Sequence, residues 1–503
     1  MSGYAPELAD VFAGADGLFA GLKGWLAGAE AAGMGHAELE KQVSVRGREL
    51  LRVVLQAHLD LRAGREQRQP AVTGPDQVTR TRAEKGHTRA LASVFGQVTV
   101  TRIAYRAPGA PNLHLLDEQL DLPAGKYSHG LCEMLARAAA QVSIAAACQT
   151  VFLRTGVRIG TRQASQVIRR AAAGFTGFYA TRRPAPAARG RVLVLEADAK
   201  GIKMRPGSLR PAAARAAAAA VSRQAGRLSQ GEVRTRKRMA EAGAVFGWVP
   251  VPRAAAGIIA LPGEDLPAQQ EPAAGRAESK CLTASVARTT GQVMAGVFAE
   301  ADRRDPARER QWIALADGNK DQLAHFAAQA AARGIDLPVL IDVIHVTEYL
   351  WDAAWSFFPP ASPDAGTWVR GHARAILDGH APEVAIAIRG QAAATPGLSA
   401  GKHKIALRAV RYLDKHAPYL DYPRFLANGW PISTGVIEGA RRHLIKDRMD
   451  ITGARWSTDG AEAVLNLRVI LANHDWDQYW PWQQQHQHHL TYRGHRTCWQ
   501  LAA

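Results

Sequence analysis

The chain has 503 residues, of which 47% are hydrophobic and 21% are charged. This length is too great for one compact core, and the composition fits neither a disordered chain nor a membrane protein. Lys and Arg total 63 against 45 Asp and Glu, and the resulting net charge of +18 is typical of proteins that bind a polyanion such as nucleic acid. A genome bias toward Arg and Ala produces the same excess, so charge alone leaves both explanations open.

The cysteines and the N-terminal segment indicate a cytoplasmic protein. Cys132, Cys148, Cys281 and Cys498 form no closely spaced pair, which fits neither a zinc knuckle nor a disulfide framework. The first residues lack the basic region and apolar run of a signal peptide, and no segment reaches the ~18 consecutive apolar residues that a membrane-spanning helix needs. We therefore expect no membrane partner.

The first part of the chain divides into three regions. Apolar residues recur every three or four positions in residues 1–75, which predicts helices. Residues 76–125 contain two alternating segments that turn at Gly96, which predicts a β-hairpin followed by a connector. Residues 126–188 are expected to be helical again.

The region 126–188 contains a pattern that resembles a helix-turn-helix. Gly156 and Gly160 end one helix, and Thr161 is placed to cap the next. The second helix carries Gln163, Arg169 and Arg170, and a recognition helix in a DNA groove needs exposed side chains of this kind. We interpret Arg169 and Arg170 as DNA-binding residues, while an ordinary helical hairpin with a basic face predicts the same pattern.

After a Pro- and Ala-rich linker near residue 189, three apolar runs each end in an aspartate. The runs VLVLEAD, WIALAD and PVLID end at Asp198, Asp317 and Asp342, as buried strands of an α/β sheet do. We predict an α/β domain with a helical insertion and a C-terminal tail; their residues are 189–345 and 431–480 for the α/β domain, 346–430 for the insertion and 481–503 for the tail.

Strand-end carboxylates at one sheet edge are suited to hold divalent cations. Reacting groups of open α/β sheets collect beyond the carboxyl ends of the strands. Mg²⁺ takes oxygen ligands, and two ions about 3.5–4 Å apart can activate the attacking oxygen and stabilise the leaving oxygen of a phosphodiester. An isolated strand-end Asp more often caps a helix or forms an Asx turn, but Asp198 and Asp317 together with a third carboxylate favour a metal site.

The third carboxylate is Glu438 in the run STGVIEGARRHLIKDRM. Ser433 or Thr434 is placed to cap a helix that contains Glu438. Three cationic residues follow on the same side of this helix and are expected to bind DNA phosphates; they are Arg441, Arg442 and Lys446. A surface helix stabilised by ion pairs has a similar sequence.

Several of these segments resemble one family. The runs ADAKGIKM, RKRMAEAGAVFGW, WIALADGNKDQL, DVIHVTEYLWDAAW and GVIEGARRHLIKDRMDITGARWS resemble the Kra-type insertion-sequence transposases, bacterial relatives of the Mutator-like DDE transposases. The resemblance covers about residues 115 to 480. It implies metal-dependent DNA cleavage at the ends of a mobile element and strand transfer into target DNA.

The resemblance also implies roles for particular residues. Asp198, Asp317 and Glu438 match the catalytic, metal-binding triad of a ribonuclease H-like domain, which uses Mg²⁺ or Mn²⁺, with two ions expected. Asp342 and His345 match the DxxH motif of the superfamily, with His345 catalytic and Asp342 accessory. The partners implied are double-stranded DNA (terminal inverted repeats and target DNA) and further copies of the chain, as a dimer or higher oligomer on DNA in the nucleoid.

Some alternatives stay open on the sequence alone. His345 could equally be a residue that packs the helix core. Arg455 and Trp456 are placed to bind DNA, with the Trp456 ring stacked on a base, but Trp456 fits a core position as well. A stand-alone nuclease on the same fold and a non-catalytic, domesticated DNA-binding protein are the alternative functions.

Overall fold

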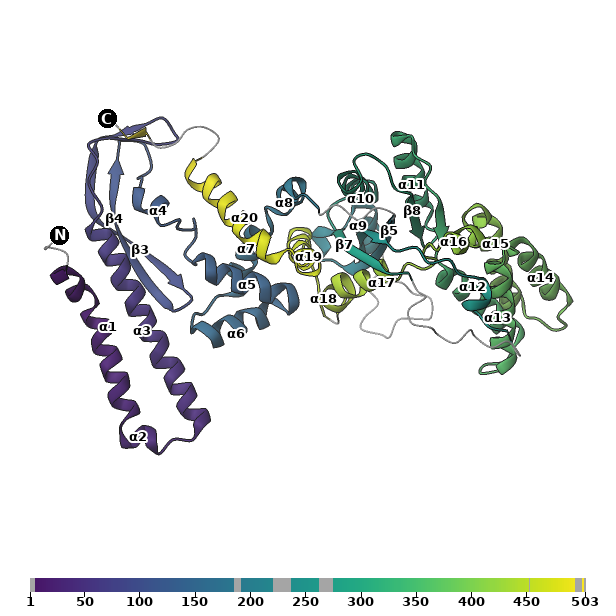
Figure 1. Cartoon of the computed structure of the whole chain (residues 1–503), viewed down its shortest axis with the longest axis horizontal. Helices are drawn as coiled ribbons and strands as arrows, with labels where there is room; N and C mark the ends of the chain where they lie inside the picture. Colours follow the sequence, from purple (N-terminus) through teal and green to yellow (C-terminus); the bar gives the residue numbers. More distant parts are fainter. Residues whose placement is uncertain are drawn as a thin grey trace. The chain divides into compact units, whose positions relative to one another are not determined.

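The structure is a computed structural model that describes residues 5–184, 191–219, 237–261, 275–451, 453–493 and 500–501 (Figure 1). The chain forms two compact units. Unit 1 comprises Met1–Ala180 and His474–Ala503, and unit 2 comprises Thr181–Asn473. The expected boundaries near residues 189 and 480 therefore lie about eight residues too late in the sequence at both junctions. None of the described helices is long and apolar enough to cross a membrane.

Unit 1 begins with a helical hairpin that packs on a β-hairpin. The helices are α1 (Ala5–Leu26), α2 (Ala29–Ala32) and α3 (His36–Gly64), and the strands are β3 (Arg82–Ser93) and β4 (Gly96–Arg106). The alternation predicted around Gly96 is confirmed, because Val98 and Val100 are buried against Leu59 of α3. The Gln56 side chain bonds both the N–H and the C=O of Thr99, which ties α3 to the strand.

Three very short strands and one short helix complete this part of unit 1. The strands are β1 (Val72–Thr73), β2 (Thr79–Arg80) and β10 (Gln500–Leu501), in the order β10-β1-β2, and the helix is α4 (Leu115–Gln119). A buried ion pair between Arg102 and Asp117, 2.6 Å apart, joins α4 to β4. The end of the chain thus returns to the beginning within one unit.

The rest of unit 1 is a helical cluster. Its helices are α5 (His129–Gln141), α6 (Ile144–Thr155), α7 (Thr161–Ala172), α8 (Phe175–Thr181) and α20 (Trp476–His488), followed by the π-helical turn η5 (His489–Arg493). Gly160, not Thr161, is the residue before the first turn of α7, and it provides no side-chain cap. The described first part of the predicted C-terminal tail is structural: Gln483 of α20 donates to the carbonyl of Arg170 at 2.9 Å, and Tyr492 of η5 donates to that of Leu122 at 2.6 Å.

Unit 2 contains a five-stranded mixed sheet. Its strands are β5 (Val192–Lys203), β6 (Lys237–Trp248), β7 (Ala277–Ser285), β8 (Trp312–Ala316) and β9 (Val339–Ile341). Their order is β7-β6-β5-β8-β9; β5, β6 and β7 are antiparallel, and β8 and β9 run parallel to β5. The α/β class predicted from the sequence is confirmed.

The two faces of strand β5 have different neighbours. Leu193, Leu195 and Ala197 pack into a core with Phe298 and Phe326; these two aromatic residues belong to α10 (Thr290–Arg304) and α11 (Lys320–Arg333). Because side chains alternate along a strand, Glu196 and Asp198 lie on the opposite face. Residues 435–440 pack on that face, because the N–H of Ile437 donates a hydrogen bond to Glu196.

Helices follow strand β9. They are α12 (Val343–Phe357), α13 (Pro363–Leu377), α14 (Ala381–Ala394), α15 (Ala400–His416) and α16 (Tyr422–Ala427), with the 3₁₀ turn η3 (Ala417–Tyr419). The segment 346–430 was predicted to be helical, and it is; its first helix begins slightly earlier, at Val343. Tyr412 donates to the carbonyl of Asp317 at 3.2 Å and Tyr422 to that of Ile341 at 2.9 Å, so the insertion is bonded to the ends of β8 and β9.

The chain then returns to the sheet. The elements are α17 (Gly435–Ala440), the π-helix η4 (Arg441–Lys446), α18 (Asp447–Met449) and α19 (Thr458–Ala472). Minor elements of unit 2 are η1 (Pro206–Ser208), α9 (Pro211–Ala219) and η2 (Ala255–Gly257). The hydrogen bond from the Ile437 N–H to Glu196 joins α17 directly to β5.

Candidate functional site

Residues from four distant parts of the sequence line one small cavity in unit 2. The cavity has a volume of about 40 Å³, room for about three water-sized groups. Its lining includes every residue that the resemblance assigned to the catalytic triad and to the DxxH motif; these are Asp198, Asp317, Asp342, His345 and Glu438. Ala197, Ile344, Glu348, Thr434 and Arg441 complete the lining.

The sheet brings the aspartates together. β5 and β8 run parallel from the Leu193–Trp312 pair to the Glu196–Leu315 pair, so Asp198 and Asp317 each lie two residues beyond the last pair. β9 runs parallel to β8 and ends directly before Asp342. One detail differs from the sequence analysis, because β5 does not end at Asp198 but continues to Lys203.

Asp198 lines the cavity and is mostly buried. Its Oδ1 accepts the N–H of Ala199 at 2.6 Å, and its Oδ2 lies 3.1 Å from Nε of Arg441. Burial raises the pKa of this carboxyl, and the neighbouring charge of Asp317 raises it further, whereas Arg441 and His345 lower it. Asp198 thus lies in the electrostatic field of three other residues of the cavity.

Arg441 lies between two carboxylates. Besides its contact with Asp198, its Nη2 lies 3.8 Å from Oε1 of Glu438, which is on the exposed side of α17. The guanidinium therefore supplies a positive charge where the carboxylates of β5 and α17 face each other. A carboxylate in a partly buried site needs such a counter-charge.

The carboxylates of the cavity are suitable ligands for a divalent metal ion, although their oxygen atoms do not surround a common point in the structure. Among the residues that the structure describes, no three His, Cys, Asp or Glu side chains are close enough together to hold a metal ion. The cavity nevertheless brings carboxylate oxygens from β5, β8 and α17 to one place, and Mg²⁺ and Mn²⁺ prefer such oxygens. The Arg441 guanidinium stands in for a cation there.

Asp342 has a positioning role in the structure. Its carboxylate is buried and accepts three hydrogen bonds, from the N–H of Ile344, the N–H of Thr434 and the hydroxyl of Thr434. These bonds cap α12 and hold Thr434, the residue directly before α17. The expected capping role of Thr434 is thereby corrected, because its hydroxyl bonds Asp342 and not the backbone of its own helix.

His345 is partly exposed and lines the cavity one turn after Asp342. It is not among the buried residues of the core, and it lowers the pKa of Asp198 through its charge. Asp317 is also partly exposed; its Oδ1 accepts the N–H of Asn319 at 2.8 Å, which is the Asx turn considered from the sequence. Its second oxygen is available to the cavity.

Glu196 is a residue of the site that the sequence analysis missed. It is completely buried, its Oε2 accepts the N–H of Ile437 at 2.7 Å, and its Oε1 has no partner among the described residues. Burial raises the pKa of this carboxyl to about 8, and the charges of Asp342 and Asp198 contribute. The signal in the sequence was a second carboxylate two positions before Asp198, and therefore on the same face of the strand.

We predict that Glu196 makes the stability of the chain depend on pH. The folded chain keeps a proton on the Glu196 carboxyl that the unfolded chain releases above about pH 4.5. The contribution of Glu196 to the free energy of unfolding is therefore full below pH 4.5 and is lost as the pH rises to about 8. Glu196→Gln keeps an oxygen for Ile437 without titrating. Between pH 6 and pH 8 the variant should gain about 2 kcal/mol in unfolding free energy relative to the wild type.

Urea unfolding at the two pH values, without metal ions, measures this difference. Glu278→Gln is the matched control, because Glu278 lies on β7 of the same sheet but is partly exposed and paired with Arg191. The change in unfolding free energy of Glu278→Gln between pH 6 and pH 8 should match that of the wild type. Parallel profiles for the wild type and Glu196→Gln would show that Glu196 is not protonated in the folded chain.

A basic cavity adjoins the carboxylates. It measures about 360 Å³ and is lined by residues of β5, α17 and η4; these are Lys200, Glu438, Gly439, Arg441, Arg442, His443 and Lys446. The three cations predicted to bind DNA thus lie together at its wall. Arg455 is exposed, but Trp456 is buried and its indole donates to the carbonyl of Met449 at 2.9 Å, so this ring is a core residue and cannot stack on a base.

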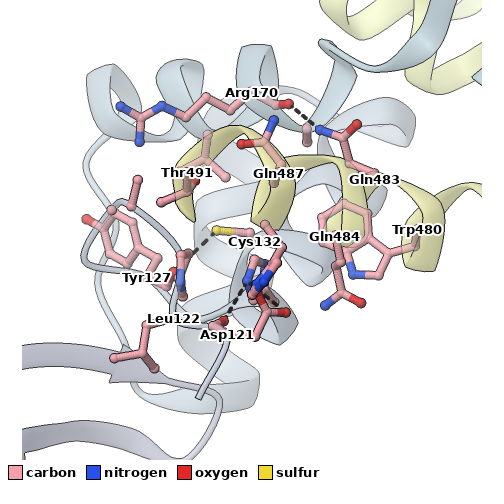
Figure 2. Close-up of a pocket in the computed structure, with 17 residues that line it drawn as sticks. Asp121, Leu122, Tyr127, Cys132, Arg170, Trp480, Gln483, Gln484, Gln487 and Thr491 are labelled. Atoms are coloured by element: carbon pink, nitrogen blue, oxygen red, sulfur yellow. Dashed lines mark hydrogen bonds and ion pairs between the residues drawn. The ribbon is translucent and has the colours of Figure 1, made fainter. Parts of the chain in front are cut away.

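Unit 1 contains a separate, mainly apolar cavity of about 240 Å³ (Figure 2). Its walls come from residues 121–132, from α7 and from α20. Arg170, one of the predicted DNA-binding residues, lies along this cavity, and its carbonyl accepts a hydrogen bond from Gln483 at 2.9 Å. Asp121 and His488 are paired at 2.8 Å on the opposite side.

No protein-family model matches this chain, and no curated protein sequence matches it.

Proposed function

We propose that the chain is a DDE-type transposase of a bacterial insertion sequence, with a ribonuclease H-like unit 2. One observation carries the proposal. Asp198, Asp317 and Glu438, which the family resemblance selected as a triad, line the same cavity although up to 240 residues separate them in the sequence. Unrelated strand-end carboxylates would have no reason to converge with a carboxylate of a late helix.

The topology of unit 2 supports the same proposal. Three antiparallel strands followed by two parallel strands, with the first strand in the centre, is the order that a ribonuclease H-like domain requires. The helices α12 to α16 enter between the last strand and the helix of Glu438, as expected for an insertion in this superfamily. The carboxylates lie beyond the ends of the parallel strands, where open sheets bind ligands.

In this proposal Asp198, Asp317 and Glu438 hold two Mg²⁺ or Mn²⁺ ions. Bound there, the ions would activate a water or a 3′-hydroxyl for attack on a phosphodiester and stabilise the leaving oxygen. Hydrolysis yields a 3′-hydroxyl at the element end and a 5′-phosphate on the other fragment. In the second step that 3′-hydroxyl attacks a target phosphodiester, so one bond forms as another breaks and no covalent enzyme intermediate is needed.

The other residues of the site bind and orient in this proposal. Arg441, Arg442 and Lys446 bind phosphates of the DNA backbone along the basic cavity. Glu196 and Asp342 fix the start of α17, whose Glu438 lines the cavity. His345 donates to an oxygen of the scissile phosphate. The partners are double-stranded DNA and further copies of the chain on the two element ends.

The test uses the full chain and a DNA duplex that carries the sequences flanking its gene, with a plasmid as target. With Mg²⁺ or Mn²⁺ we expect a cut at the junction that leaves a 3′-hydroxyl, and joining of that end to the plasmid. EDTA should abolish both steps. Cutting without joining would identify a stand-alone nuclease, and binding without cutting under either metal ion would identify a non-catalytic DNA-binding protein.

A further inference from the structure

The outer face of α7 carries three exposed polar side chains in one row. Arg162, Gln166 and Arg169 are four and three residues apart, so they lie on the same side of the helix. We propose that this row enters the major groove of double-stranded DNA and reads base edges. The inference deepens the proposed function, and rests on it, because it names the surface of unit 1 that recognises the DNA to be cut.

The opposite face of α7 fixes the helix in place. Its residues Ala164, Val167, Ile168, Ala171 and Ala172 are buried. The connection from α6 is five residues long, begins at Gly156 in a left-handed conformation (φ 72°) and contains the buried Ile159. Burial on one side and a short turn that contains glycine are features that α7 shares with the second helix of a helix-turn-helix.

The charge of this part of the chain fits a polyanion. The sequence contains no Asp or Glu from residue 134 to residue 195, whereas eight arginines lie between residues 134 and 184. Arg154 and Arg158 are exposed at the turn that precedes α7. Such a surface attracts the DNA backbone, because phosphate binding releases condensed counterions. Arg154 and Arg158 are placed to bind phosphates while α7 lies in the groove.

The three side chains have the chemistry of base recognition. Arginine makes paired hydrogen bonds with guanine, and glutamine makes them with adenine. Within the described part of the chain, the side chains of Arg162 and Gln166 form no hydrogen bond or ion pair, so both can bond a base. Arg169 uses its Nε for the carbonyl of Ser165 at 3.2 Å, which leaves its two Nη groups for a guanine.

The residues of α7 proposed to contact DNA differ from those expected from the sequence, which were Gln163, Arg169 and Arg170. Gln163 accepts the hydroxyl of Tyr127 at 2.6 Å and is partly buried, so it belongs to the packing of α7 on its neighbours. Arg170 lines the cavity of Figure 2, and its carbonyl bonds Gln483 of α20, so we leave it out of the row. Duplex RNA does not fit the proposed row, because its major groove is too deep and narrow for a helix.

The test selects DNA sequences with the full chain from a pool of 30-base-pair duplexes of random sequence. The wild type should enrich one motif. Arg162→Ala, Gln166→Ala and Arg169→Ala should each weaken binding to that motif about 5- to 150-fold, the range for loss of one paired base contact. Binding to a scrambled duplex should change much less. Gln166→Ala should in addition relax the preference at one base pair.

Two control variants distinguish base recognition by α7 from non-specific binding to DNA phosphates. Arg411→Ala removes an exposed arginine of α15 and should leave motif and affinity unchanged. Arg154→Ala should weaken binding to the motif and to the scrambled duplex equally, as loss of a phosphate contact does. The proposal is overturned if the wild type enriches no motif, if the three α7 variants keep both motif and affinity, or if duplex RNA competes as well as the motif.

The outcome for α7 is distinguishable from the outcome for the proposed transposase. If the wild type enriches a motif that the α7 variants lose, but cuts no DNA, α7 reads DNA and the transposase proposal fails. If the wild type cuts and joins the flanking DNA while the α7 variants select the same motif, the transposase proposal stands and recognition by α7 is refuted. Asp198→Ala should retain the wild-type motif in either case, because it lies in the other unit.

Discussion

Replacing Asp198, Asp317 or Glu438 by alanine should lower the rate of DNA cleavage about 10³-fold or more, while the chain still folds and binds DNA. Each residue contributes carboxylate oxygens to one cavity, and metal-bound phosphoryl chemistry depends on several kcal/mol of charge stabilisation. The three effects should not add, since loss of one ligand already empties the site. A double variant should therefore be no slower than the slowest single variant.

The measurement is single-turnover cleavage of an end duplex, together with melting temperature and DNA affinity for each variant. Asp336→Ala is the matched control, because Asp336 is 81% exposed in the same unit and lies 3.6 Å from Arg424. It should cut at the wild-type rate. A wild-type rate in any one of the three variants would remove that residue from the proposed metal site, and additive losses would mean that the three do not act together.

His345→Ala is expected to lower the cleavage rate about 10- to 1,000-fold, which is the effect of removing one charge-stabilising donor. The structure supports a site role, because His345 lines the cavity beside Asp198 and is partly exposed. The melting temperature should barely change. His345→Gln should recover part of the rate, since an amide can still donate one hydrogen bond.

Melting curves beside cleavage assays distinguish this role from simple packing. A packing residue would cost about 1–3 kcal/mol of stability on truncation, with the rate per folded molecule preserved. His403→Ala on α15 is a control for the loss of a partly exposed histidine in the same unit. A less stable His345→Ala variant with a normal rate at low temperature would refute the catalytic role and leave the triad proposal untouched.

The sequence predicted the strands of unit 2 well, because burial on both faces leaves a clear local pattern. The runs that lead to Asp317 and Asp342 are apolar, and strands β8 and β9 end directly before these two residues. Asp198 was harder to place. β5 continues past it to Lys203, because its pairing with β6 extends to Lys237, and an antiparallel partner is not visible in the strand's own sequence.

The missed residues depend on contacts between distant parts of the chain. Glu196 bonds a backbone N–H 241 positions later, and no periodicity within β5 encodes that contact. The same holds for Trp456, whose neighbours Lys203 and Met449 decide that it is buried. Residues 481–503 contain many Gln and His residues and were predicted to form a tail, yet the Trp482 ring of α20 packs with Phe178 of α8.

Because α20 follows all of unit 2 in the sequence, unit 2 can fold during synthesis before unit 1 has its last helix. Unit 1 needs the aromatic residues of α20 next to α7 and α8, but α20 leaves the ribosome only after all of residues 181–473. Domains fold as units while the chain is being made. The carboxylates of unit 2 are therefore assembled while α7 still lacks the support of α20, and a nascent chain completes unit 1 last.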